Sequence, residues 1–210
     1  MCLDPAGLPF TLGALGAALA AGLLLDWRAA APFAVLTACF AFFFRDPERR
    51  APADAAGTSV LAPADGRVLV AGPAAAAAAP DGSWLQVSIF LSPLDVHVNR
   101  VPVSGKVTRV ELTRGRFLPA YRPEAAAANE RSEIWIDHGG QIIVARQVVG
   151  VLARRVVCRL REGTEVQAGD RLGIMKFGSR MDVFLPVTAA LRVKAGDRVR
   201  GGETVIAVLQ

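Results

Sequence analysis

The stretch VQAGDRL at residues 166–172 recurs as VKAGDRV at residues 193–199. Each copy places Ala-Gly-Asp between aliphatic residues, and this pattern is typical of a tight turn that joins two strands. Two such units predict that the C-terminal part of the chain is built from hairpins of short strands.

Short β-type runs separated by turn residues continue upstream, from residue 67 to residue 160. We therefore expect a mainly β domain, a flattened barrel or sandwich that resembles the hammerhead folds of biotinyl and lipoyl carriers. The segments 71–80 and 117–132 are expected to lie outside the strands, and long loops in a compact β domain are often functional. The expected strands are Arg67–Val70, Trp84–Leu91, Lys106–Leu112, Ile134–Asp137, Gln141–Val149 and Val151–Leu160.

The N-terminal part differs sharply in composition. Residues 8–25 and 29–44 contain no charged side chain, and they account for a positive mean hydropathy of +0.36. A helix needs roughly 20 apolar residues to cross a bilayer, with about 17 as the practical minimum, so the first run is long enough and the second is marginal. We expect a membrane-anchoring helical hairpin over residues 1–50. A spanning hairpin and a re-entrant anchor in one leaflet both remain open.

Arg45, Arg49 and Arg50 follow the second apolar run. Because basic residues beside a membrane segment favour the cytoplasmic side, we expect the β-rich domain, residues 51–210, on the cytoplasmic face of the cell membrane. Its first residues, 51–58, are rich in small side chains and are typical of a linker.

Charge and cysteine content narrow the range of partners. The net charge of +5 favours anionic lipid headgroups. The basic residues are scattered and form no helix rich in Lys and Arg, so nucleic acid is not an expected partner. Cys2, Cys39 and Cys158 lack the spacing of a disulfide framework or a metal site, and they fit a reducing compartment.

The most reactive candidate is the pair Gly178-Ser179 in KFGSRMD, residues 176–182. Because glycine has no Cβ, the serine hydroxyl can approach the carbonyl of Gly178 in a backbone geometry that other residues resist. A self-cleaving peptide bond needs this arrangement. Gly-Ser is also common in turns where the serine caps its own backbone, so the pair alone does not decide between the two readings.

The chain has only two histidines. His97 lies among polar residues in LSPLDVHVNRVP and is the better candidate for a general acid or base. His138 precedes Gly139-Gly140, which predicts an exposed hairpin turn. Asp65, in APADG, is either a turn residue or a carboxylate that orients a distant imidazole.

Five motifs occur in order along the chain: APADG (62–66), FLSPLDVHVNR (90–100), NER (129–131), ARR (153–155) and KFGSR (176–180). In this order they resemble the proenzymes of phosphatidylserine decarboxylases, most closely the short bacterial and archaeal form. The resemblance covers roughly residues 45–210, and the preceding hydrophobic hairpin also fits it.

The resemblance implies a pyruvoyl enzyme that makes its own prosthetic group. Ser179 would attack the carbonyl of Gly178 to give an ester. β-Elimination would then leave a large β chain (1–178) and a small α chain (179–210) that begins with the pyruvoyl group. The ketone of this group would form a Schiff base with the substrate amine and accept the electrons left when carbon dioxide departs.

Roles for the other residues follow from the same resemblance. His97 would carry the proton during processing or after decarboxylation, and Asp65 would orient His97 or help it take up the serine proton. The substrate would be phosphatidylserine in the membrane and the product phosphatidylethanolamine, in phospholipid biosynthesis. The α chain is too short to fold alone and would stay woven into the β chain. Homo-oligomer formation remains open.

Two positions depart from the longer members of this family. They have a second histidine where this chain has Arg100, so the base for self-cleavage is left open. They have Leu-Gly-Ser-Thr where this chain has Phe177-Gly178-Ser179-Arg180. Arg180 is expected either to hold a substrate phosphate or carboxylate, or to face solvent from a strand.

Two other functions compete with this interpretation. Lys176, between the two Ala-Gly-Asp turns, resembles the lysine that biotinyl or lipoyl carriers modify. A membrane-anchored adaptor with a similar β fold would need no chemistry at all. Both alternatives predict one unbroken polypeptide, whereas the processing model predicts two.

Overall fold

The computed structural model describes residues 2–52, 57–77, 79–151, 156–176 and 178–210. The chain divides into two compact units, Met1–Glu48 and Arg49–Gln210, which we call the hairpin unit and the body. The expected linker at 51–58 falls at the start of the body and is described only in part.

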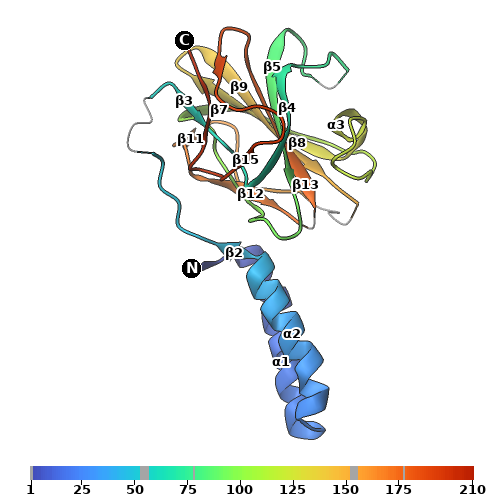
Figure 1. The fold of residues 1–210 in the computed structure, drawn as a ribbon. Helices are drawn as coiled ribbons and strands as arrows, with labels where there is room; N and C mark the ends of the chain where they lie inside the picture. The colour runs from blue at the N-terminus through green and yellow to red at the C-terminus, as the bar shows by residue number, and fades with distance from the viewer. Residues whose placement is uncertain (1, 53–56, 78, 152–155, 177) are drawn as a thin grey trace. The chain divides into compact units, whose positions relative to one another are not determined.

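The hairpin unit contains two apolar helices that run side by side (Figure 1). The short helix η1 (Pro5–Gly7) leads into α1 (Leu8–Leu24), and α2 (Trp27–Phe43) follows after a brief connection. Asp26 begins α2 as its N-cap, with its carboxylate accepting the N–H of Ala29 at 2.9 Å. At the open end, β1 (Cys2–Leu3) pairs antiparallel with β2 (Arg45–Asp46).

The outer surface of this hairpin is apolar. Leu12, Leu19 and Leu23 on α1 are 61%, 59% and 85% exposed, and Val35 on α2 is 63% exposed. Pro5–Leu24 is long and apolar enough to cross a membrane, whereas α2 is shorter, as expected from the sequence. Helices with apolar residues on all sides are typical of a lipid environment.

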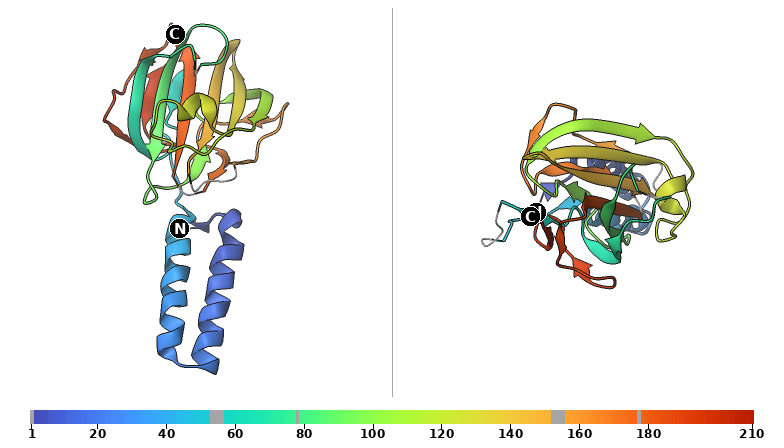
Figure 2. Two further views of the ribbon diagram at one scale, coloured as in Figure 1. Left: turned by 90° about the vertical axis from the view of Figure 1, so that its right-hand side faces the viewer. Right: turned by 90° about the horizontal axis from the view of Figure 1, so that it is seen from above.

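The body is mainly β, as expected, and it has three sheets (Figure 2). The large sheet has eight antiparallel strands in the order β11-β7-β8-β9-β13-β5-β4-β15. Two small sheets have the orders β10-β12-β6 and β14-β16-β3. The strands of the body are β3 (Ser59–Leu61), β4 (Gly66–Pro73), β5 (Trp84–Leu91), β6 (Val98–Arg100), β7 (Gly105–Thr113), β8 (Arg131–His138), β9 (Gln141–Val149), β10 (Val156–Cys158), β11 (Glu165–Val166), β12 (Arg171–Met175), β13 (Ser179–Pro186), β14 (Ala190–Leu191), β15 (Arg198–Val199) and β16 (Val205–Val208).

One aliphatic core lies between the large sheet and the small ones. Alternate residues of the long strands, such as Ile89 on β5, Ile136 on β8 and Val183 on β13, point into it. Leu172 on β12 and Ile206 on β16 fill it from the other side. β13 lies between β5 and β9 in the sheet, and all of its residues except Pro186 are buried, so both of its faces are covered.

The two Ala-Gly-Asp repeats adopt the same turn. Asp170 accepts the N–H of Gln167 at 2.8 Å, and Asp197 accepts the N–H of Lys194 at 2.9 Å. The expectation that each turn closes a hairpin is wrong, because the strands on either side belong to different sheets. A turn fixes the local direction of the chain, but strand pairing depends on the rest of the fold.

The long expected strands are present, with boundaries that differ by a few residues. β4 extends to Pro73, into a segment expected outside the strands, because it pairs with β5 along its whole length. The segment 117–132 contains α3 (Ala125–Ala128), which lies outside the sheet (Figure 1), and the start of β8. Of the strand expected at 151–160, the structure describes β10, and residues 152–155 lie outside the described ranges.

The last 32 residues are woven through the body. β13 pairs with β5 and β9, β15 pairs with β4, and β16 pairs with β3. A chain cut before Ser179 would therefore keep all four of these pairings with the remainder. The whole segment contributes to one core rather than to a separate domain.

Candidate active site

Ser179 is the first residue of the central strand β13. It stands opposite Leu91 of β5 and Val149 of β9, and it is fully buried. Gly178, just before it, has φ of +73°, a left-handed conformation that favours glycine. Among the described residues, Oγ of Ser179 has no hydrogen-bond partner. A buried hydroxyl without a partner is rare in a merely structural serine, which usually caps a backbone group.

His97 lies beside this peptide bond, although it is 81 residues away in sequence. Its Nε2 accepts the backbone N–H of Gly178 at 3.3 Å. Its Nδ1 lies 2.9 Å from the carbonyl oxygen of Asp95, which can only accept, so Nδ1 carries the proton. The ring is fully buried. These two neighbours fix a neutral tautomer whose basic nitrogen points at the Gly178–Ser179 segment.

The carbonyl of Gly178 is packed tightly against Gly150. A Cβ placed on Gly150 would lie 2.1 Å from that oxygen, far inside van der Waals contact. Gly150 follows β9, the strand that pairs with Ser179. The absence of a side chain at residue 150 is therefore what allows the carbonyl of Gly178 to lie where it does.

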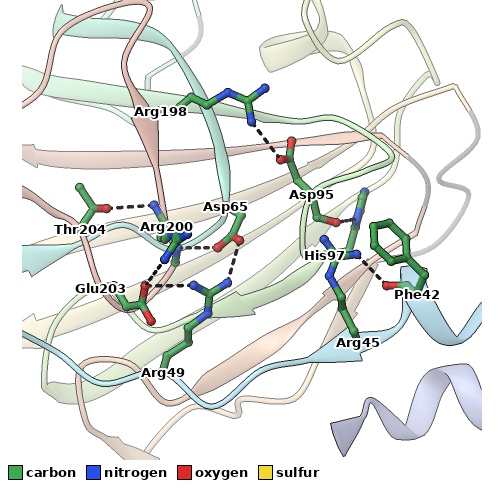
Figure 3. A network of polar contacts seen from close by, with 11 residues as sticks. Phe42, Arg45, Arg49, Asp65, Asp95, His97, Arg198, Arg200, Glu203 and Thr204 are labelled. Atoms are coloured by element: carbon green, nitrogen blue, oxygen red, sulfur yellow. Dashed lines mark hydrogen bonds and ion pairs between the residues drawn. The ribbon is translucent and has the colours of Figure 1, made fainter. Parts of the chain in front are cut away.

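Asp65 holds the turn before β4, as Figure 3 shows. One carboxylate oxygen accepts from Arg49 at 2.7 Å and the other accepts the N–H of Gly201 at 2.8 Å. Arg49 also donates to Glu203 at 3.1 Å. Within the described part of the chain, both oxygens of Asp65 are therefore bonded to groups other than His97.

The turn that carries Asp65 is nevertheless linked to the histidine segment. The carbonyl of Pro63 accepts the N–H of Arg100 at 2.8 Å, so the turn is fastened to β6, which begins directly after His97. The side chain of Arg100, where longer family members have a histidine, donates to the carbonyl of Gly169 at 3.1 Å and is buried.

Arg180 is not a solvent-facing residue, contrary to one of the two expectations for it. It is 4% exposed and lies on the face of β13 opposite to Ser179. Its guanidinium donates to Asp182 at 2.6 Å and to Ser88 at 2.8 Å. Burial by the densely paired sheet explains the difference, because both faces of β13 are covered.

A second buried arginine lies on the same outer face. Arg146 of β9 is paired with Glu133 at 2.9 Å. Desolvation lowers the pKa of this guanidinium, and the Glu133 carboxylate opposes that shift. On this face of the sheet, each of the two buried arginines is thus paired with a carboxylate of the same sheet.

An apolar cavity of about 180 Å³ opens beside Gly178. The loop between β7 and β8 forms part of its wall, and Asn129 fastens this loop. Its side chain donates to the carbonyls of Leu118 and Val149, each at 2.8 Å, and accepts the N–H of Leu118 at 2.9 Å. The motif containing Asn129 was visible in the sequence, but only the structure gives it this role. The cavity is lined by Phe90, Pro93, Pro119, Ala120, Tyr121, Val151 and Gly178.

Large apolar side chains from three segments are exposed at or next to this cavity. Leu94 is 72% exposed, Tyr121 58%, Val151 51% and Phe117 39%. Tyr121 and Val151 line the cavity, Leu94 directly follows the lining residue Pro93, and Phe117 is two residues before the lining residue Pro119. We call these four residues the apolar rim. Exposed apolar clusters of this kind mark binding surfaces for proteins, ligands or membranes.

Two buried amides near Ser179 were missed by sequence reasoning. Asn99 and Gln147 are both fully buried, and Nε2 of Gln147 donates to Oδ1 of Asn99 at 2.8 Å. Asn99 lies inside the motif that contains His97, but a single sequence gives no signal that links it to Gln147.

The remaining candidates lie elsewhere. His138 is the last residue of β8 and is half-buried, rather than exposed as expected, with Nδ1 2.7 Å from the carbonyl oxygen of Ser104. Lys176 is half-buried directly after β12. The motif residues 153–155 and Phe177 lie outside the described ranges. Within those ranges, no cluster of three His, Cys, Asp or Glu side chains is placed to hold a metal ion.

Comparison with known proteins supports one family. A profile described as phosphatidylserine decarboxylase matches residues 36–207. A phosphatidylserine decarboxylase proenzyme of Nocardia farcinica is 46% identical over 211 residues, which cover 99% of this chain and 87% of the relative. Proenzymes of the same name from Salinibacter ruber (47% identical, covering 79% of this chain and 73% of the relative) and Nitrosomonas europaea (39%, covering 96% and 92%) are also similar.

Proposed function

The chain belongs to the phosphatidylserine decarboxylase family, and on that premise we propose that it decarboxylates phosphatidylserine to phosphatidylethanolamine with a pyruvoyl group made from Ser179. The observation that carries the proposal is the buried, unpartnered hydroxyl of Ser179 next to a left-handed glycine and a neutral histidine. The same residues fit the formation of a pyruvoyl group at the start of β13.

Processing begins with Ser179 in this proposal. Its Oγ attacks the carbonyl carbon of Gly178, the C–N bond breaks, and an ester replaces the amide. β-Elimination then releases a β chain that ends at Gly178. Water hydrolyses the remaining dehydroalanine, ammonia leaves, and an N-terminal pyruvoyl group results. The left-handed conformation of Gly178 supports this step, because most other residues resist it.

His97 is the proposed proton carrier. Its basic Nε2 is directed at the Gly178–Ser179 segment, and its Nδ1 proton is held by the carbonyl of Asp95. A backbone carbonyl fixes the tautomer without adding charge, so the ring can take up a proton and return it. Arg100 occupies the place of the second family histidine, which leaves His97 as the imidazole for both processing and turnover.

Asp65 is proposed as a positioning residue rather than as a direct partner of the imidazole. Its carboxylate fixes the turn through Arg49 and Gly201, and the carbonyl of Pro63 in that turn holds β6. Loss of the carboxylate would loosen the strand that follows His97. The expected contribution is therefore to the placement of the ring.

The pyruvoyl group, once formed, supplies a ketone conjugated to an amide carbonyl, which is an electron sink for loss of the carboxyl group. The residues of this chain bind, orient and exclude water around it. Phe90, Pro119 and Tyr121 give the neighbouring cavity an apolar wall. His97 holds the proton that the reaction returns to the carbon that loses carbon dioxide.

A lipid substrate is supported by two surfaces of the molecule. The hairpin unit presents apolar residues outward, as a membrane anchor does, and the apolar rim surrounds the cavity at Gly178. The loop that carries part of the rim also exposes Arg114, Arg116 and Arg122, which suit anionic headgroups. We propose that the body works at the cytoplasmic surface of the membrane, in keeping with the arginines after α2.

The variant Ser179→Ala tests the proposal. It should give a single chain of 22.1 kDa without decarboxylase activity, while the native protein gives two chains, residues 1–178 and 179–210. Intact mass after denaturation is the measurement. Because three strands of the small chain make four pairings with strands of the large chain, the two chains should stay together under native conditions.

The competing functions predict different results. A carrier modified at Lys176 would remain uncut and gain mass on that residue. A non-catalytic adaptor would keep its function in Ser179→Ala. A native protein that is folded, uncut and still active on phosphatidylserine would contradict the proposal.

A further inference from the structure

The buried amides of Asn99 and Gln147 lie on the same side of the large sheet as Ser179. Gln147 on β9 stands opposite Met181, two residues along β13 from Ser179, so all three side chains point toward the core. The bond from Nε2 of Gln147 to Oδ1 of Asn99 joins β9 to β6. The pair brings two amides into a core that is otherwise mostly aliphatic.

Each amide keeps one polar atom unused. Within the described part of the chain, Nδ2 of Asn99 and Oε1 of Gln147 are buried without a partner, as is Oγ of Ser179. Oxygen and nitrogen of an amide are assigned from their contacts. If oxygen and nitrogen are exchanged in both side-chain amides, the hydrogen bond between them is preserved, and Asn99 becomes the donor in place of Gln147. In either orientation one NH2 and one carbonyl stay unpaired, which proteins normally avoid.

These unused atoms belong to one group with the scissile bond. Asn99 follows His97 by two residues, and residues two apart in extended chain share a face. His97 contacts the N–H of Gly178. Ser179 and Gln147 are diagonal neighbours on paired antiparallel strands, a separation that a long side chain can span.

We propose that the Asn99–Gln147 pair positions the Ser179 hydroxyl for its attack on Gly178, an inference that rests on the proposed function. In the arrangement that attacks, a rotation of these side chains lets the unpaired carbonyl of the pair accept the hydroxyl hydrogen, which fixes the direction of the oxygen lone pairs. In the attack the Oγ–C bond forms, the C–N bond between the two residues breaks, and His97 carries the hydroxyl proton to the freed amine of Ser179. The pair exchanges no proton and acts by orientation alone.

The double variant Asn99→Leu/Gln147→Met tests this role. It replaces both amides by apolar side chains of similar size, so no buried amide is left without its hydrogen-bond partner. Exchanges of this kind change the free energy of unfolding little. Full-length chains are made by cell-free synthesis, and conversion to two chains is followed over time by intact mass. We expect cleavage to slow by about tenfold or more, the factor that one hydrogen bond in the barrier supplies.

Gln86 provides a matched control. It is also a glutamine in the large sheet, 3% exposed, and its buried Nε2 has no partner among the described residues. It stands opposite Phe184, on the other face of the sheet from Ser179. Gln86→Met should therefore cleave at the native rate, whereas the single variant Gln147→Met should slow cleavage as the double variant does.

Two further measurements separate orientation from folding. In a Ser179→Ala background, which cannot cleave, the double variant should melt within about 4 °C of its parent. Neutral hydroxylamine, which cleaves esters, should not accelerate chain cleavage in the double variant, because an attack that is slowed leaves no ester to accumulate.

Three results would overturn the inference: native-rate cleavage by the Asn99→Leu/Gln147→Met or Gln147→Met chain, equal slowing by Gln86→Met, or rescue by hydroxylamine. A Ser179→Ala double variant that melts far lower would assign the pair a structural role instead. A native chain that never cleaves would contradict the proposed function itself, so the two failures can be told apart.

Discussion

His97 is held in one tautomer by two backbone groups, and this explains how a single imidazole can serve the site. The carbonyl of Asp95 keeps the proton on Nδ1, and Nε2 faces the N–H of Gly178. No carboxylate is needed to choose the tautomer. The proposed role of Asp65 therefore concerns the position of the ring more than its charge.

Replacement of His97 by Ala is expected to lower decarboxylation by about 100-fold or more, because general acid–base catalysis typically contributes that much. Carbon dioxide release per processed chain is the measurement. His138→Ala, which removes the other histidine from the β8–β9 turn, should keep native turnover. Normal turnover in His97→Ala would remove this residue from the mechanism.

The close approach of Gly150 to the carbonyl of Gly178 can be tested by adding a methyl group. In Gly150→Ala the new Cβ would lie 2.1 Å from the Gly178 carbonyl oxygen, so the backbone must shift. We expect slower cleavage and a destabilisation of about 1–3 kcal/mol, which is typical of overpacking. Gly72→Ala on β4, where nothing lies within 4 Å of the added Cβ, is the control. Equal cleavage rates for the two variants would show that the close approach is unimportant.

Among the secondary elements, β13 and the loop before β8 decide the site. β13 fixes Ser179 by pairing on both sides, so this residue would stay in place after the proposed cleavage. The loop supplies one wall of the cavity but has little regular structure beyond α3. Its position depends on side-chain bonds, chiefly those of Asn129.

Asn129→Ala should destabilise the body, because it removes three hydrogen bonds and leaves the backbone groups of Leu118 and Val149 without that partner. The expected cost is about 3 kcal/mol, or a fall in Tm of roughly 6–12 °C. Thermal unfolding in the Ser179→Ala background measures it without interference from cleavage. Asn129→Asp keeps the acceptor for the N–H of Leu118, so its Tm should lie between that of the Ser179→Ala parent and that of Asn129→Ala. A Tm unchanged in both Asn129 variants would refute the fastening role.

At the scale of the whole molecule, the chain combines an apolar hairpin unit with a β body that carries its own apolar surface. Each unit offers apolar groups outward, and both fit a substrate that stays in the bilayer. The proposed membrane attachment would confine the search for substrate to a surface.

The apolar rim should matter only for membrane-bound substrate. Leu94→Ser/Phe117→Ser, which changes two rim residues that do not line the cavity, is expected to lower turnover of long-chain phosphatidylserine in vesicles by about tenfold, because two apolar side chains no longer enter the lipid layer. Turnover of a water-soluble short-chain analogue should be unchanged. Leu112→Ser on β7, 61% exposed and not part of the cavity wall, is the control. Equal losses on both substrates would mean that the rim supports the site itself.

Much of this architecture is predictable from the sequence. The uncharged runs 8–25 and 29–44 predict the two helices, and alternating β-branched residues predict the long strands. These patterns are local, because they depend on residues adjacent in the chain and on the period of each element. Gly178-Ser179 was likewise singled out by residue type and by its place among ordered motifs.

Only the tertiary structure decided how these parts meet. In the structure His97 lies beside Gly178, and Arg180 forms a buried ion pair with Asp182. The strands before and after each Ala-Gly-Asp turn belong to different sheets. The structure also joins Asn99 to Gln147 across two sheets. Such contacts depend on strand order and register, which arise from packing of the entire core and leave no periodic trace in the sequence.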